Sequence, residues 1–174
     1  SECAEAFAES FGRRAWRRPL DADEIARIGS LITSIGTAAG DFATGAEYGL
    51  AAMLQSPHFL YRTEHGDGGA ELGEFELASR LSFLLWNSIP DEELLGAAEA
   101  GELNTREGLE NQLERMLDDS SAGRGIRNLF TEAYGLYGLD TLTKDPLVFT
   151  HASPDLGPAA KEETLQVIET LALG

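Results

Sequence analysis

The chain has 174 residues, of which 43% are hydrophobic, and its 30 acidic against 13 basic side chains give a formal net charge of −17. A chain of this length buries about 70% of its unfolded surface, which is enough for a stable core. The acidic charge repels phosphate backbones, which argues against nucleic acid as a partner, and the single cysteine excludes an internal disulfide and a Cys-x-x-Cys-His haem attachment.

The first predicted helix spans residues 2–14. Its apolar face carries residues at four-residue steps, namely Cys3, Phe7 and Phe11. Pro19 then interrupts the helical pattern. Asp21 and Glu24 have the spacing of a capping box, which predicts the start of a second helix. The predicted buried stripe of that helix is Ile25, Ile28, Leu31, Ile32 and Ile35.

The glycine-rich residues 36–40 predict a break, after which Asp41 can cap a third helix that runs to about Gln55. The predicted core residues of this helix are Phe42, Tyr48, Leu50, Met53 and Leu54. Gly45 and Gly49 share one face, because they are four residues apart. They would let another helix approach closely, at a propensity cost of about 1 kcal/mol each.

Ser56 and Pro57 read as a helix cap followed by a proline in the first turn, and they predict a short helix that ends near Glu64. Residues 65–69 are the clearest flexible connector and the predicted boundary between an N-terminal subdomain, 1–65, and an acidic C-terminal subdomain, 66–174. The first holds six basic and nine acidic side chains, a net charge of −3. The second holds seven and 21, a net charge of −14.

The next helix, predicted over residues 74–87, is apolar nearly all the way round, which is typical of a central buried helix. Its apolar residues are Phe75, Leu77, Leu81, Phe83, Leu84, Leu85 and Trp86. Further helices are predicted over 91–100, 105–117 and 122–136, with Asn104 or Thr105 as the cap of the middle one. A long loop is expected over 138–157, and Pro158 is expected to open the last helix.

The predicted fold is all-α, because no convincing alternating apolar run is present. We expect a multi-helix bundle of about seven to eight helices, either as one body or as two packed helical subdomains. No stretch reaches the 18 or so apolar residues of a membrane span, so membrane insertion by this chain is not expected. The final residues 171–174 still follow an apolar helical pattern, so we expect the C-terminal subdomain to be truncated there.

Three strings of residues carry a family resemblance: residues 11–20, residues 56–64, and residues 77–86 followed by Pro90 and Asp91. The chain resembles two consecutive uncharacterised helical domains, domains of unknown function, of large secreted planctomycete-type proteins that often also carry cytochrome-c-like domains. The resemblance implies an extracytoplasmic location and haem c in another part of the full-length chain, with no cofactor in this part. It brings no catalytic residues.

Arg80 is the most informative single candidate, because an always-charged guanidinium in an apolar helix must reach the surface or find an anion. We expect a buried structural ion pair, and the candidate partners are Glu64, Asp91 and Glu132. The alternative is an anion site for a ligand carboxylate.

His58 and Arg62 lie one helical turn apart with Glu64 just beyond, so a base, a cation and an acid could meet there. The candidate ligand-binding residues are therefore His58, Arg62 and Arg80. The competing interpretation is structural, because a histidine beside a proline at a helix start more often satisfies a backbone carbonyl.

Other clusters have simpler explanations. Four arginines around Trp16 could grip phosphate, but cations at a helix end also complement its dipole and pair with nearby carboxylates. His151, Asp145 and Asp155 could hold a divalent cation, but their spacing matches no standard loop, and no metal site is predicted. Adjacent glutamates are expected in so acidic a chain and do not indicate a glycosidase.

The leading functional hypothesis is a noncatalytic helical scaffold or interaction module of a multidomain protein. Its expected partners are other domains of the same chain or a basic redox protein such as a cytochrome, steered by the acidic surface. The alternative is a ligand-binding or hydrolytic domain with a site near His58, Arg62 and Arg80.

Overall fold

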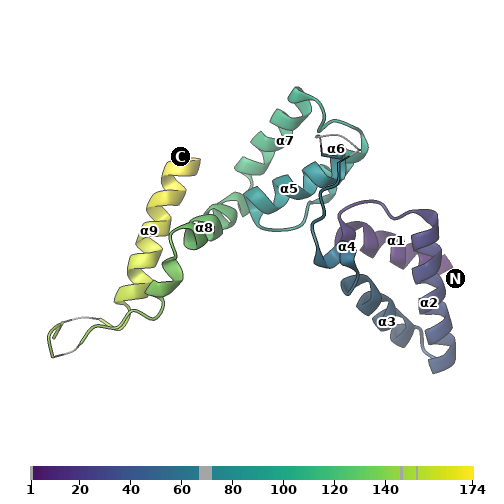
Figure 1. Cartoon of the computed structure of the whole chain (residues 1–174), viewed down its shortest axis with the longest axis horizontal. Helices are drawn as coiled ribbons and strands as arrows, with labels where there is room; N and C mark the ends of the chain where they lie inside the picture. Colours follow the sequence, from purple (N-terminus) through teal and green to yellow (C-terminus); the bar gives the residue numbers. More distant parts are fainter. Residues whose placement is uncertain (1, 67–71, 146, 152) are drawn as a thin grey trace. The chain divides into compact units, whose positions relative to one another are not determined.

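The computed structural model describes residues 2–66, 72–145, 147–151 and 153–174, and these ranges fold into helices without a strand (Figure 1). The all-α class is therefore confirmed. In chain order the elements are α1 (Glu2–Trp16), α2 (Ala22–Ala39), α3 (Phe42–Leu54), α4 (Pro57–Leu60), α5 (Glu74–Trp86), α6 (Glu92–Glu99), α7 (Arg106–Asp118), α8 (Ser121–Ala133), the 3-10 helix η1 (Leu136–Leu139) and α9 (Leu156–Leu173). Among the described residues, eight α-helices have eight or more residues, in line with the expected seven to eight, and α4 adds a short one of four residues.

The chain divides into two compact units, which are described separately. The first is Ser1–Ser82 with Ser88–Glu110, and the second is Phe83–Asn87 with Asn111–Gly174. The subdomain boundary expected between residues 65 and 66 stays a prediction. Of the predicted connector 65–69, the last three residues lie outside the described ranges.

Helices α1, α2 and α3 pack against one another and enclose the core of the first unit (Figure 1). Its buried members are Ala4, Ala8, Ala15, Trp16, Leu20, Ile28, Ile32 and Met53. Small residues on α1 bring the helices close, and Leu20 lies against the bare backbone of Gly12. Burial of this apolar set, at about 25 cal/mol per Å², is what holds the three helices together.

The crossing of α2 and α3 depends on two glycines, as the sequence predicted. A methyl group at Gly45 would collide with the backbone carbonyl of Ile32, and one at Gly49 would lie 2.5 Å from the Ile32 Cγ1 atom. Ile32 is fully buried at this contact. The expected close approach is therefore confirmed.

The break predicted over residues 36–40 is present but shorter, because α2 continues through Gly36 to Ala39 and its C-cap is Gly40, whose φ is +72°. The packing explains the difference. Backbone atoms of Gly36 lie against Gly45 of α3, so this glycine allows the helices to cross instead of ending α2. Tertiary contact here overrides the low helix propensity of glycine.

The predicted core of α3 is only partly correct. Met53 is fully buried, but Phe42, Tyr48 and Leu54 are 50%, 56% and 37% exposed. The buried face of α3 is set by its glycines and Met53, and the three exposed side chains lie outside that face. Apolar character alone did not indicate which side of the helix faces α2.

The short helix after α3 begins as predicted, with Ser56 as its cap and Pro57 in its first turn. The Ser56 hydroxyl accepts a hydrogen bond from the His58 N–H at 3.3 Å. The helix ends at Leu60 and not near Glu64, because Tyr61 is already extended.

Helix α5 is buried on one side and not all round as predicted. Ala78 and Ser82 are fully buried, whereas Leu84 is 58% exposed. At its start, the Glu74 carboxylate accepts hydrogen bonds from the backbone N–H groups of Leu103 and Asn104, at 3.1 and 3.3 Å. These bonds tie the first turn of α5 to the turn that precedes α7.

In the second unit, α8 packs against α9 and η1. The Arg127 guanidinium of α8 bridges Glu162 and Glu169 of α9. The loop predicted over residues 138–157 is shorter than expected, because η1 occupies its first residues and α9 begins at Leu156, ahead of Pro158.

Candidate functional site

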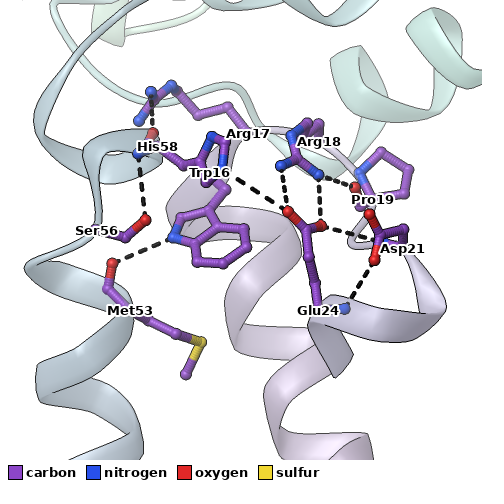
Figure 2. Close-up of polar contacts among 9 residues, drawn as sticks. All are labelled: Trp16, Arg17, Arg18, Pro19, Asp21, Glu24, Met53, Ser56 and His58. Carbon is purple, nitrogen blue, oxygen red and sulfur yellow. Dashed lines mark hydrogen bonds and ion pairs between the residues drawn. The ribbon is translucent and has the colours of Figure 1, made fainter. Parts of the chain in front are cut away.

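The turn between α1 and α2 brings together polar and aromatic side chains from separate segments of the sequence. Helix α1 ends at Trp16, and Arg17 then adopts a left-handed backbone conformation with φ +58°. The chain reverses through Pro19, and Asp21 caps α2. We call residues 16–21 the first corner, and Figure 2 shows it with the residues that contact it.

Trp16 is the apolar centre of the first corner. Its ring is 7% exposed and its indole Nε1 donates a hydrogen bond of 3.2 Å to the backbone carbonyl of Met53 (Figure 2). The Arg18 guanidinium lies 5.5 Å from the ring centroid, within the range of a cation–π contact. The His58 ring lies 4.9 Å away, tilted by 45°. Trp16 thus joins α1 to α3 and to the start of α4.

Arg17 is buried and binds backbone carbonyls. Its guanidinium donates to the carbonyl oxygens of His58 at 2.8 Å, Tyr61 at 3.1 Å and Ala15 at 3.1 Å. Burial lowers the pKa of this guanidinium from its ordinary value, and the nearby Arg62 lowers it further. The side chain therefore ties both ends of α4 to the end of α1.

Arg18 and Glu24 form a two-pronged ion pair, with N–O distances of 2.8 and 2.7 Å. The Glu24 carboxylate also accepts the backbone N–H of Asp21 at 3.0 Å, which completes the predicted capping box. Glu24 is 6% exposed. The hydrogen bonds from Arg18 lower its pKa to about 2, because they favour the charged carboxylate more than burial opposes it.

His58 lies at the edge of this network. Its Nε2 atom is 3.8 Å from the nearer carboxylate oxygen of Glu24, and its side chain is half exposed (Figure 2). The ring covers one side of Trp16. In chemical terms the arrangement is a network of mutually paired groups that joins α1 to α2, α3 and α4.

Comparison with protein families gives two matches, one in each part of the chain. Residues 72–173, more than half of the chain, match a family described as "Protein of unknown function (DUF1592)". The chain belongs to the DUF1592 family. Residues 3–64 match a second family of proteins of unknown function, DUF1595. No curated protein and no solved structure matches the chain.

The resemblance to two consecutive uncharacterised domains is thus confirmed, with a DUF1595 domain followed by a DUF1592 domain. The first corner, α3 and α4 all lie within the DUF1595 domain. The strings over residues 11–20 and 56–64 are the two segments that meet there, through Arg17 and His58. The structure therefore gives these strings a shared physical role in joining helices.

Arg80, in the DUF1592 domain, pairs with Glu64, one of its three candidate partners. The distance from Arg80 Nε to Glu64 Oε1 is 3.7 Å. The pair is exposed, with side-chain exposures of 61% and 40%, so the expected burial is wrong. The physical reason is that Arg80 lies on the outer side of α5, away from the face that carries Ala78.

The other candidate ion-pair residues have separate positions. Asp91 caps α6, and its carboxylate accepts the Leu94 N–H at 2.9 Å. Glu132 is an exposed residue of α8 in the second unit. Of the candidate ligand-binding residues, His58 joins the network around Trp16, and Arg62 acts electrostatically on Arg17.

The weaker candidates can also be placed. Within the described ranges, no three His, Cys, Asp or Glu side chains gather as a metal site needs. No helix among those residues combines the length and apolar character that crossing a membrane requires. Two of the four arginines around Trp16 pair with carboxylates, as the simpler interpretation held: Arg18 with Glu24, and Arg13 with Glu92 at 3.3 Å and Glu99 at 3.0 Å.

Sequence reasoning missed Arg17 as a key residue and saw only half of the role of Glu24. The capping-box spacing identified Glu24 at the start of α2, but its partner Arg18 comes from the preceding turn. Nothing in the sequence marks Arg17 as left-handed or buried. The only available signal was that Arg17 and His58 both lie in strings that carry the family resemblance.

Proposed function

We propose that this chain is a noncatalytic helical scaffold and interaction module of a multidomain extracytoplasmic protein, next to a haem-bearing domain. The observation that carries the proposal is that the polar groups at the first corner bind the backbone or one another. The Arg17 guanidinium donates hydrogen bonds to backbone carbonyls, and Arg18 and Glu24 form an ion pair with each other. Groups committed in this way stabilise a fold, whereas a reacting site needs polar groups directed at a substrate.

The proposed partner is a basic protein, a second domain of the same chain or a redox protein such as a cytochrome. The support is electrostatic: the net charge of −14 lies in residues 66–174. On α7, Glu107 and Glu114 are exposed carboxylates two helical turns apart. Such a surface attracts a basic partner over a Debye length of about 10 Å at 0.1 M salt and speeds its association more than it tightens the complex.

Calorimetric titration of a basic cytochrome c into the chain at low salt tests the docking. We expect binding that weakens as salt is added. The double substitution E107K/E114K should weaken it clearly, whereas E2K/E9K, which makes the same charge change on exposed α1 positions, should leave it nearly unchanged. No binding at low salt, or equal loss in both variants, would contradict docking through the acidic region.

The rival proposal is a ligand-binding or hydrolytic domain with a site near His58, Arg62 and Arg80. H58A separates the two, because the scaffold role has the ring covering Trp16. If the scaffold proposal holds, H58A should lower the free energy of unfolding by about 1 kcal/mol, the scale of one aromatic contact. Urea denaturation measures this loss. Unchanged stability together with loss of binding in a ligand screen would favour the rival.

A further inference from the structure

The first corner has a counterpart later in the chain, at the end of α5. Trp16 is the last residue of α1, and Trp86 is the last residue of α5. The residue that follows each tryptophan is left-handed: Arg17 has φ +58° and Asn87 has φ +50°. These are the non-glycine residues for which a positive φ is found in the described ranges, and a non-glycine residue adopts this conformation uncommonly.

The two indole rings also bind in the same way. The Trp16 Nε1 atom donates to the Met53 carbonyl at 3.2 Å, and the Trp86 Nε1 atom donates to the Met116 carbonyl at 2.8 Å. Both tryptophans are 7% exposed and both methionines are fully buried. In each case the methionine lies on the second helix after the tryptophan, α3 or α7.

A guanidinium lies beside each indole ring at the same distance. Arg18 is 5.5 Å from the Trp16 centroid, and Arg115 is 5.5 Å from that of Trp86. The two arginines come from different positions, one from the corner itself and one from the residue before Met116. The contact is shared, although the residue that supplies it is not.

The start of the next helix repeats as well. Asp21 and Asp91 each stand five residues after the tryptophan and cap the following helix. The Asp21 carboxylate accepts the N–H three residues on at 2.7 Å, and that of Asp91 does so at 2.9 Å. The turn between tryptophan and cap therefore has one length in both places.

The helices that precede the two tryptophans bury small residues at matching positions. Eight residues before each tryptophan, Ala8 and Ala78 are both fully buried. Four residues before it, Gly12 and Ser82 are both buried. One helical face thus carries the same sequence of small side chains toward the corner.

The third helix of each set has a glycine that lies against a backbone carbonyl. A methyl group at Gly45 would collide with the carbonyl of Ile32, and one at Gly108 would collide with the carbonyl of Glu102. Each glycine lies eight residues before the methionine that accepts the indole N–H. The Gly45 contact joins α3 to α2, whereas Glu102 lies in the turn just before α7, so the shared feature is the position of the glycine relative to the methionine.

Apart from the two arginines, these correspondences follow two fixed offsets. From the buried alanines to the capping aspartates the offset is 70 residues, and from the glycines to the methionines it is 63. The change of seven residues falls between these two stretches, where α6 is ten residues shorter than α2 and the linker to the next helix is longer in the second set. A constant register on both sides of one length change is typical of two copies of one unit.

We infer that the chain contains a duplicated helix–corner–helix motif, with one copy from α1 to α3 in the DUF1595 domain and one from α5 to α7 in the DUF1592 domain, each built around a tryptophan corner. The second corner comprises residues 86–91. The inference is independent of the proposed function. It assigns the same local role, ending one helix and starting the next, to residues 16–21 and 86–91.

An exchange of corners tests the equivalence in the full chain. The variant N87R/S88R/I89P/P90L gives the second corner the sequence of the first and keeps Asp91. If the corners are equivalent, its melting temperature should fall by only a few degrees. With W16F as background, Trp86 should keep the blue-shifted emission of a buried indole.

The matched control N87P/S88R/I89R/P90L has the same composition but places proline at the left-handed position. Because proline fixes φ near −65°, it should lower the melting temperature by about 10 °C. Equal damage in the exchange and the control would overturn the inference. So would an exchange variant whose Trp86 emission shifts to that of an exposed indole.

Discussion

At the scale of single residues, the first corner shows how a strained backbone is offset by side-chain bonds. A non-glycine residue held in the left-handed region costs on the order of 1 kcal/mol. Arg17 accepts this cost, and its guanidinium reaches three backbone carbonyls that otherwise lack a helical partner at the ends of α1 and α4. A flat guanidinium with several donors suits this task better than an ammonium.

Replacing Arg17 with lysine should therefore be costly although the charge is kept. We expect R17K to lower the free energy of unfolding by about 2 kcal/mol, because one ammonium cannot satisfy carbonyls on both sides of α4. The measurement is urea denaturation followed by circular dichroism. R14K, at an exposed position of α1, is the control and should behave as the native chain does.

Glu24 gives the corner a defined pH dependence. Its pKa is about 2 in the folded chain against an ordinary 4.5, so only the unfolded chain takes up a proton between these values. The stabilisation from Glu24 is therefore complete above about pH 4.5 and is lost as the pH falls toward 2. The carboxylate must stay charged to hold Arg18.

The substitution E24Q isolates this contribution. At neutral pH we expect a loss of about 2 kcal/mol, between the values for exposed and buried ion pairs. The difference between E24Q and the native chain should shrink as the pH is lowered toward 2, measured by urea titrations at several pH values. D23N, at the exposed neighbouring position, should show no comparable trend.

At the scale of helices, glycine has opposite meanings at different positions. Gly45 lies where the backbones of α2 and α3 touch, whereas nothing lies within 4 Å of the position a methyl group would take at Gly96 of α6. Helix propensity favours alanine at both, by about 1 kcal/mol. Packing decides which of them must remain glycine.

The two alanine substitutions should therefore differ in sign. We expect G96A to raise the free energy of unfolding by up to about 1 kcal/mol. G45A should lower it by about 2 kcal/mol or more, because the backbone carbonyl of Ile32 cannot move aside as a side chain does. Thermal unfolding followed by circular dichroism measures both, and a stabilising G45A would contradict the packing at this crossing.

At the scale of the whole molecule, the uneven charge bears on binding and the repeated corners bear on folding. The charge is concentrated in residues 66–174, which hold 21 of the 30 acidic side chains, and this is the basis of the proposed docking to a basic partner. The repeated corners concern folding and not binding. Each lies at the junction of consecutive helices and is built mainly from contacts among residues of its own set.

Much of the helical layout follows from local sequence signals. Asp21, Asp41, Ser56 and Thr105 each cap a helix as predicted, because a cap depends on a side chain and the backbone N–H two or three residues on. Helix ends without such a local signal were placed less well, as the continuation of α2 through Gly36 shows.

The sequence by itself determined the all-α class, the family resemblance, the acidic C-terminal charge and most helix starts, because these depend on composition and on contacts a few residues apart. Only the tertiary structure decided that Arg17 closes the first corner, that Arg80 is exposed, and that Trp16 and Trp86 occupy equivalent places. Those features depend on pairings between distant residues, 16 apart for Arg80 and Glu64 and 30 or more for the two indoles, or on backbone angles that no local pattern specifies.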